Sequence, residues 1–281
     1  MTAVADVPEH YTRLLDHGFV GLVDHMGGDD AIVQAARISI AGTNVKATSS
    51  DRGLIRYLLR MWHTTPFEMV QLKFHAKMPM FVARQWVRHR MASINEMSAR
   101  YSELPGEFYI PEPENLKKQA INNKQGRSEE GFTAAEMDEI LHIITTQSEN
   151  GYYAYQRLLE LGLARELSRM VLPVNIYTEW YWKTDLHNMF HFLRLRMNPH
   201  AQWEIRIFAN AMAEMVKSIA PIAFEAFEDF RLNSMALTAQ DCDALGAFIP
   251  EDVGDDELEM GLFKTKREQS EFIQKYRTLT G

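Results

Sequence analysis

The sequence predicts a single α+β domain. Segments that alternate like β-strands are interleaved irregularly with segments of helical periodicity, which favours this class over a regular βαβ array. A chain of 281 residues is long enough for one large domain or two small ones. Residues 1–281 contain no internal repeat, low-complexity tract or clear interdomain linker, so we expect one domain.

Local patterns predict the elements of the first third of the chain. Residues 18–28 alternate loosely and end in a glycine pair, which indicates a strand and a turn. Residues 29–38 form the next helix, and its first two residues, both aspartates, can cap it. Residues 49–51 offer another cap, before a helix on which apolar residues repeat over 54–61. In residues 70–76 apolar residues alternate with polar ones, as in a half-buried strand.

Polar composition and a capping motif predict the organisation of the second half. Residues 112–132, rich in Lys, Asn, Gln, Glu and Gly, are typical of an exposed insertion. Thr133 and Glu136 resemble a capping box, which opens a long helix to about Leu161. The further elements we expect are a helix at 164–172, a strand at 174–182, helices at 185–198 and 200–220, and a surface helix at 264–276. Residues 232–281 form an acidic C-terminal extension, for which the sequence indicates no function.

Composition excludes several classes of protein. The net charge of −8 argues against a general nucleic-acid binder, and 46% hydrophobic residues suffice for a core. Cys242 is the only cysteine, so no internal disulfide is expected and a reducing cytosol is indicated. Residues 1–6 have neither a basic region nor an apolar core, so we expect no signal peptide. No apolar run is long enough to span a bilayer.

The most unusual segment is residues 88–101, RHRMASINEMSARY. It begins at the C-terminus of a helix whose first turn suits Pro79, and we expect it to run out into a loop. Hydrogen-bond donors at this density need partners, and the planar fork of arginine matches phosphate or carboxylate. The segment therefore predicts a site for a multiply charged anion. The alternative is a set of arginines held in surface salt bridges.

Arginines outside this segment extend the same hypothesis. Arg169 lies in an apolar stretch, where an unpaired charge is costly unless it serves a ligand. The alternative is a buried ion pair with Glu166. The residues that we expect to converge on a phosphate and a base are Gln85, Arg88, Arg100, Arg169 and Arg196.

His187 and His191 are four residues apart and share one face of a helix. That spacing can hold a transition metal, and His200 with Glu204 repeats it, but no HExxH motif is present. The other interpretations are hydrogen-bonded core histidines or contacts with an anionic cofactor. The cofactor is favoured because Arg194, Arg196 and His200 add positive potential nearby.

Neither Ser98 nor Cys242 has the surroundings of a nucleophile. No Gly-x-Ser-x-Gly elbow surrounds Ser98, which is better explained as a hydrogen-bonding group for a ligand. Asp241 and Asp243 flank Cys242 and disfavour its thiolate. The residues Trp203, Phe208, Met212 and Met215 are interpreted as core, and the aromatics of 177–182 suit burial or an oligomer interface.

Residues 88–101 carry every fixed position of the RHRxxSxNExSxRY signature and so resemble the flavin-dependent thymidylate synthases. The similarity extends over about residues 63–205. It implies the fold of a thymidylate synthase-complementing protein, with a mixed or antiparallel central sheet flanked by helices. It also implies reductive methylation of dUMP to dTMP, with 5,10-methylenetetrahydrofolate as the carbon donor and NADPH-reduced FAD as the hydride source. A cytoplasmic homotetramer with active sites at its subunit interfaces is expected, without a nucleic-acid or membrane partner.

The resemblance also implies particular site residues. The expected FAD contacts are Thr65, Arg88, His89, Arg90, Glu96, Asp185, Leu186, His187, His191 and His200. The expected dUMP contacts are Gln85, Trp86, Val87, Arg88, Glu96, Met97, Ser98, Ala99, Arg100, Arg169 and Arg196. Arg196 is expected to be catalytic, because a guanidinium there would stabilise negative charge on the pyrimidine and make its C5 carbon nucleophilic. His187 stands where many relatives have arginine, and no metal is implied.

Two other classes make different predictions. A metal-dependent hydrolase built on His187 and His191 would contain zinc or iron and lose activity to chelators. A nucleotide- or RNA-binding module built on residues 88–101 would bind without turnover, with an affinity that falls steeply with salt. The acidic net charge counts against this module.

Overall fold

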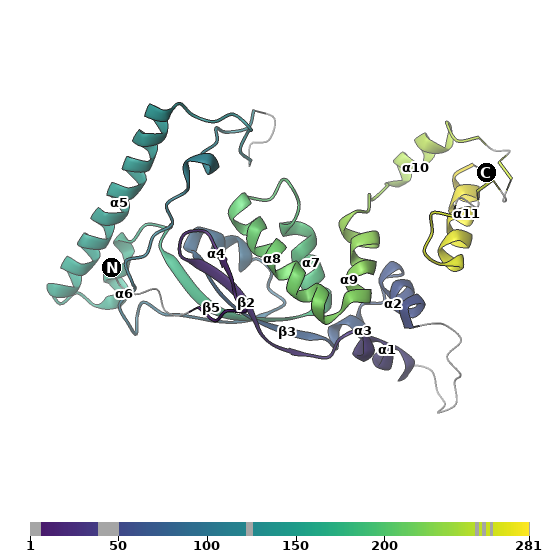
Figure 1. Ribbon diagram of the computed structural model, residues 1–281, viewed down its shortest axis with the longest axis horizontal. Coiled ribbons are helices and arrows are strands. Elements are labelled where there is room, and N and C mark those ends of the chain that lie inside the picture. Colours follow the sequence, from purple (N-terminus) through teal and green to yellow (C-terminus); the bar gives the residue numbers. More distant parts are fainter. Residues whose placement is uncertain are drawn as a thin grey trace.

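The computed structural model describes residues 7–38, 51–121, 126–250, 253–254, 257–258 and 261–280. A five-stranded antiparallel sheet of order β1-β2-β3-β5-β4 lies at its centre (Figure 1). The strands of this described part are β1 (Thr12–Leu14), β2 (Gly18–Met26), β3 (Gln71–Pro79), β4 (Ser93–Glu96) and β5 (Tyr177–Asp185). The α+β class and the antiparallel sheet are thus confirmed.

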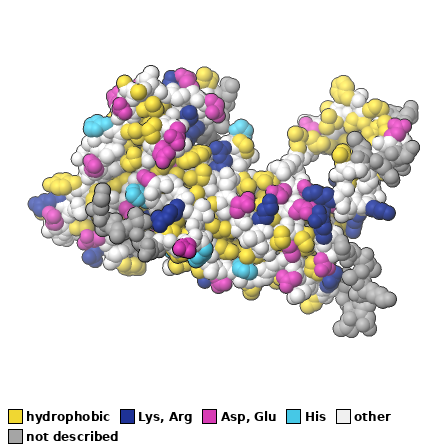
Figure 2. Space-filling model, viewed as in Figure 1, with side chains coloured by type: hydrophobic (Ala, Val, Ile, Leu, Met, Phe, Trp, Pro, Cys, Tyr) yellow, Lys and Arg dark blue, Asp and Glu magenta, His cyan; other side chains and the backbone are white. Residues whose placement is uncertain are grey.

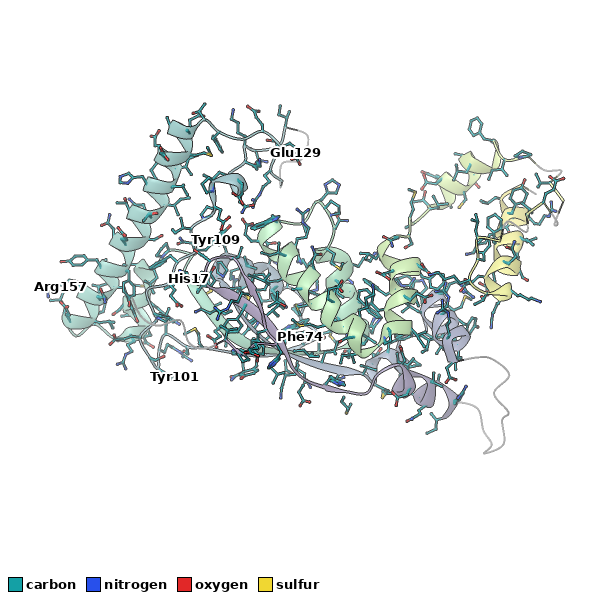
Figure 3. All side chains as sticks on the ribbon, in the orientation of Figure 1. His17, Phe74, Tyr101, Tyr109, Glu129 and Arg157 are labelled. Carbon is teal, nitrogen blue, oxygen red and sulfur yellow. The ribbon has the colours of Figure 1, made fainter. Side chains whose placement is uncertain are left out.

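The central strands β3 and β5 bury one face of the sheet more completely than the other. In β3, Leu72, Phe74 and Ala76 are buried and alternate with half-buried polar residues, as the sequence predicts. Phe74 lies opposite Trp182 of β5, below the helices in Figure 3. On the outer face, the ring of Tyr181 stacks on that of His75 with centroids 4.6 Å apart. The aromatics of β5 therefore divide between the core and the outer face.

Helices cover the buried face of the sheet (Figure 1). The helices that pack there are α4 (Met80–Trp86), α7 (Leu186–Arg196) and α8 (Trp203–Ile219), followed by α9 (Pro221–Phe227) and the π-helical turn η3 (Glu228–Leu232). Phe208 and Met212 of α8 are fully buried, as predicted, and Met215 packs against the core. Trp203 is only half-buried and lies outside this core, because the first turn of α8 faces the insertion at 112–132.

Two groups of elements lie at opposite ends of the sheet (Figure 1). One end carries η1 (Pro113–Asn115), α5 (Ala134–Glu160), α6 (Arg165–Ser168) and η2 (Arg169–Val171). The other carries α1 (Asp29–Ile38), α2 (Asp51–Arg60), α3 (Thr65–Glu68), α10 (Ala239–Gly246) and α11 (Lys266–Thr280). The capping box of Thr133 and Glu136 is present at the start of α5, and α11 confirms the final helix within one turn.

Three local predictions need correction, and a fourth concerns residues that the structure does not describe. The Asp29 carboxylate was expected to cap α1, but it accepts the amides of Ile222 and Ala223 at the start of α9, at 2.8 and 2.9 Å. Part of the segment 88–101 is the edge strand β4 and not a loop, since β5 offers it a free edge. The helix expected at 164–172 is a short α-helix followed by a 3-10 turn. The cap at residues 49–50 lies outside the described residues.

None of the described helices combines the length and the apolar character needed to cross a membrane. On the face drawn in Figure 2, basic and acidic side chains are mixed, without one large basic field.

Candidate functional site

The segment 88–101 spans the edge strand β4, and its two ends line two different hollows. Residues 88–91 follow the end of α4 and face α7. Residues 96–101 leave β4 at its other end and face residues 169–178. Antiparallel pairing of β4 with β5 holds the two ends apart. The hollows share no lining residue, so a single chain does not bring the expected contacts to one point.

We call the first one the histidine hollow. Its lining residues are Arg88, His89, Arg90, Met91, Trp182, Thr184, His187, Asn188, His191, Leu195 and Arg196. Asp185 caps α7 by accepting the Asn188 amide at 2.9 Å, which fixes the start of the helix that carries His187, His191 and Arg196. The Thr184 hydroxyl holds residues 88–91 in place by donating to the Met91 carbonyl at 2.9 Å.

Arg196 is held by two acceptors at the base of the histidine hollow. Its Nε donates to His89 Nε2 at 3.0 Å, and its Nη2 donates to the Gln85 carbonyl at 3.2 Å. Burial lowers the pKa of Arg196. Burial, followed by the charges of Arg196 and His191, lowers the pKa of His89 to about 4. His89 is therefore neutral at pH 7 and able to accept from Arg196.

We call the second one the arginine hollow. Its lining residues include Glu96, Met97, Ser98, Ala99, Arg100, Tyr101, Arg169, Pro173 and Thr178. Glu96 is fixed by Thr178, whose hydroxyl donates to its carboxylate at 2.6 Å. Arg100 lies 5.5 Å from the ring centre of Tyr101, and Tyr101 projects from the edge of the molecule (Figure 3).

The cations of both hollows lack acidic partners, unlike many arginines elsewhere. Among the described residues, Arg88, Arg90, Arg100 and Arg169 make no ion pair, whereas Arg56 and Arg127 each bind buried carboxylates. Arg169 is exposed and donates only to the backbone carbonyl of Glu166, so it is not buried with Glu166. Exposed guanidinium groups without counterions, gathered in two hollows, are suited to a polyanionic ligand.

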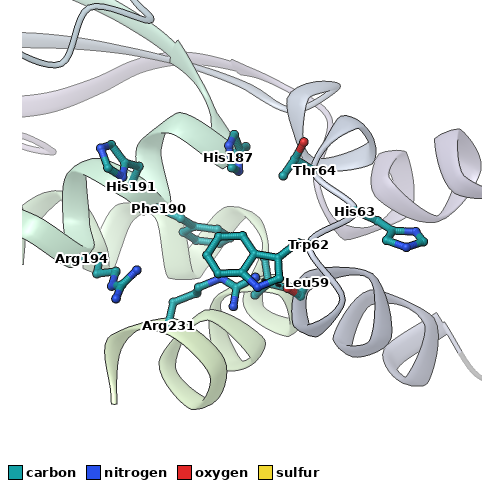
Figure 4. A pocket seen from close by; sticks show the side chains of 9 residues that line it. All are labelled: Leu59, Trp62, His63, Thr64, His187, Phe190, His191, Arg194 and Arg231. Atoms are coloured by element: carbon teal, nitrogen blue, oxygen red, sulfur yellow. Dashed lines mark hydrogen bonds between the residues drawn. The ribbon is translucent and has the colours of Figure 1, made fainter. Parts of the chain in front are cut away.

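A third hollow lies behind α7, and we call it the tryptophan hollow (Figure 4). It shares His187 and His191 with the histidine hollow, and adds Trp62, Thr64, Phe190, Arg194 and Arg231. The Arg231 guanidinium lies 3.4 Å from the ring centre of Trp62 and donates to the Leu59 carbonyl. In Figure 4, His63 points away from the other side chains. Sequence reasoning missed Trp62, Thr64 and Arg231, since only the fold brings them beside α7.

Several expected contacts lie outside these hollows. Trp86 is fully buried and packs on Trp182 and Phe192 with ring centres 5.5 and 5.0 Å away. Thr65 is exposed at the start of α3, one residue from Thr64. Leu186, the first residue of α7, is buried, and His200 lines a separate hollow with residues of the insertion. Gln85 and Val87 are half-buried beside the histidine hollow.

In the part of the chain that the structure describes, the side chains form no metal site and do not activate Ser98 or Cys242 as a nucleophile. There, no group of three or more His, Cys, Asp or Glu side chains could hold a metal ion. The Ser98 hydroxyl accepts the Arg100 amide at 3.3 Å, and Cys242 lies on α10. The geometry instead presents two cationic hollows at the ends of one edge strand, which suit a polyanionic ligand.

The model of the family described as thymidylate synthase complementing protein matches residues 21–222, and the chain belongs to that family. It is 54% identical over 236 residues to the flavin-dependent thymidylate synthase of Ruegeria pomeroyi, covering 83% of this chain and 78% of the relative. It is 55% identical over 239 residues to that of Thermus thermophilus, covering 85% and 86%. A UMP/dUMP methylase, PolB from Streptomyces cacaoi, solved with 5-bromo-dUMP bound, has a TM-score of 0.70 and 36% identity, covering 80% of this chain and all of that one.

Proposed function

We propose that this chain is a flavin-dependent thymidylate synthase. It converts dUMP, 5,10-methylenetetrahydrofolate, NADPH and a proton into dTMP, tetrahydrofolate and NADP⁺, with FAD carrying the hydride. The observation that carries the proposal is the group of unpaired arginines at the two ends of β4, in a chain whose relatives carry this name.

The residues around α7 fit FAD. A dinucleotide needs cations for its pyrophosphate and apolar or aromatic surfaces for its rings. Arg88, Arg90 and Arg194 offer the cations, and Trp62 and Phe190 offer the ring surfaces. When bound, FAD supplies the hydride chemistry, while the protein supplies position and electrostatics. His187 and His191 line both the histidine hollow and the tryptophan hollow, so they would contact FAD bound in either one.

The arginine hollow suits the phosphate of dUMP. Arg100 and Arg169 supply charge, and the Ser98 hydroxyl supplies a hydrogen bond. At the histidine hollow, Arg196 keeps guanidinium hydrogens beyond those that His89 and Gln85 accept. Directed at the pyrimidine, they stabilise negative charge on the ring and raise electron density at C5, which then attacks the one-carbon unit.

Self-association completes this site. One chain offers a phosphate-binding hollow and a separate base-binding hollow, so a nucleotide that uses both draws them from two subunits. We propose a homotetramer with active sites at subunit interfaces, working in the cytoplasm.

An absorption spectrum with Arg196 replaced tests the proposal. The wild-type protein with FAD is expected to show a flavin band that dUMP perturbs, and to form dTMP. Arg196→Ala should bind FAD but form no measurable dTMP, because the ring charge loses its partner. Arg84→Ala, which removes an exposed charge on α4 outside the hollows, is the matched control for charge loss and should retain dTMP formation. A protein that cannot be reconstituted with FAD, or near-normal turnover by Arg196→Ala, would contradict the assignment. The same assay with UMP in place of dUMP tests whether the protein discriminates between ribose and deoxyribose.

A further inference from the structure

A continuous hydrogen-bonded chain runs from the insertion at 112–132 to Arg196. Arg127 donates to both oxygens of Glu204 at 2.7 Å, and Glu204 accepts from Gln202 Nε2 at 2.9 Å. Gln202 Oε1 in turn accepts from Gln85 Nε2. The backbone carbonyl of Gln85, not its side chain, accepts from Arg196 Nη2 at 3.2 Å. We call the side-chain part of this chain, Glu204 to Gln202 to Gln85, the amide relay.

Glu204 is the anchor of the relay. It lies in the first turn of α8 and is only 4% exposed. Its charge is compensated by Arg127, which is 32% exposed, and Tyr109 donates a further hydrogen bond to it at 3.3 Å. Arg127, Tyr109 and Gln202 all donate to Glu204, so its carboxylate acts only as an acceptor. Its position is therefore set by the insertion, 77 residues earlier in the chain.

The carboxylate of Glu204 decides the direction of each amide in the relay. A carboxylate only accepts hydrogen bonds, so Gln202 must turn its NH₂ group toward Glu204. Its carbonyl oxygen then faces Gln85, which must in turn donate with its own NH₂ group. The side-chain carbonyl Oε1 of Gln85 is thereby left to accept from something else. Without the charge at Glu204, both amides could reverse, and Gln85 would offer its NH₂ group there instead.

We propose that Glu204 is a positioning residue that fixes the amide orientation of Gln85 and thereby presents Gln85 Oε1 to a hydrogen-bond donor of the nucleotide. The insertion at 112–132 belongs to the nucleotide site through Arg127. This inference rests on the proposed function in one respect, namely that Gln85 contacts dUMP.

Double-mutant cycles on the FAD-loaded protein test the relay. The single variants are Glu204→Gln, Gln202→Leu and Gln85→Leu, and the double variants combine each of the first two with Gln85→Leu. Calorimetry measures their dUMP affinity, and dTMP formation gives their KM and kcat. Glu204→Gln and Gln202→Leu should each weaken dUMP binding about tenfold, the worth of one hydrogen bond, and raise KM with little change in kcat. In the Gln85→Leu background neither should weaken it further, because the group through which they act is gone.

The outcomes separate the inference from the assignment on which it rests. Glu130→Gln is the matched control, since Glu130 pairs with Lys118 in the insertion but does not touch the relay, and its dUMP affinity should equal wild type. Equal losses with and without Gln85 would reveal a merely structural role and overturn the proposal, as would wild-type affinity in both relay variants. Gln85→Leu with wild-type affinity would instead remove Gln85 from the nucleotide site. If Glu204→Gln does not fold, Gln202→Leu carries the same test.

Discussion

At the scale of single residues, neutral His89 governs how Arg196 is presented. Its lowered pKa has burial as the first cause, followed by the charges of Arg196 and His191. Protonation would set two cations against each other across the 3.0 Å contact. Since the folded pKa, about 4, lies below the ordinary 6.5, protons bind the unfolded chain first as pH falls. This contribution to stability is therefore complete above pH 6.5 and is lost as pH falls toward 4.

We expect His89→Leu to lower dTMP formation tenfold to roughly a hundredfold, because Arg196 loses a charge-assisted acceptor worth about 1.5–3 kcal/mol. His89→Gln keeps an acceptor and should retain most activity. The same glutamine variant should lose less unfolding free energy than wild type between pH 6.5 and 4, as measured by urea unfolding. His142→Gln on the exposed face of α5 is the control, and an identical loss in all three proteins would contradict the role of His89.

At the scale of elements, one buried arginine attaches the C-terminal extension to the body. Arg56 of α2 is 2% exposed and contacts Glu225, Asp229 and Glu268, each at 2.7 Å. Glu268 belongs to α11 and is 6% exposed. Basic and acidic side chains are gathered where this extension joins the body (Figure 2). A buried charge network thus holds the C-terminal extension, for which the sequence indicated no function. The network lies beside the tryptophan hollow, because Arg231 lines that hollow and also a hollow lined by Asp229 and Glu268.

We expect Arg56→Met to lower the free energy of unfolding by about 3 kcal/mol, because it leaves Glu268 and its neighbours short of a buried partner. Urea unfolding measures the change. Arg157→Met removes the exposed pair with Glu160 on α5 and should cost less than about 1 kcal/mol. A similar, small loss in both variants would show that the buried network contributes no more than a surface pair.

At the scale of the whole molecule, the proposed site has one half at each end of β4. The histidine hollow and the arginine hollow have no residue in common, and β5 pairing holds them apart. In the proposed tetramer, a nucleotide that uses Arg196 from one hollow and Arg169 from the other bridges two chains. The association of chains and the formation of the site are then the same event.

Mixing two inactive variants tests this shared site. Arg196→Ala and Arg169→Ala are each expected to lose dTMP formation. Hybrid oligomers refolded or co-expressed at equal ratio should recover about a quarter of wild-type activity, since that share of interfaces combines two intact halves. Analytical ultracentrifugation of each protein checks that a tetramer forms. Activity that stays at zero in confirmed hybrids would place both halves of the site within one chain.

Local patterns in the sequence predicted the parts of the fold whose causes are local. The alternation of β3, the capping box of Thr133 with Glu136 and the final helix follow from neighbouring residues, and the structure confirms them. The chemistry of residues 88–101 could also be predicted, because the types of side chain alone indicate an anion site. The helix expected at 200–220 ends at Ile219, as predicted to within one residue, but the following helix α9 was missed, although Pro221 suits its first turn.

Only the tertiary structure decided where these chemical groups meet. Asp29 caps α9 across 193 residues, and Gln202 reaches Gln85 across 117, contacts that no local pattern encodes. Packing against β5 made an edge strand of a segment that looked like a loop, and so sent its two ends to separate hollows. The sequence by itself determined the family and the kinds of groups that bind the ligand. Folding determined which of them share a hollow, because hydrogen bonds and burial depend on proximity in space.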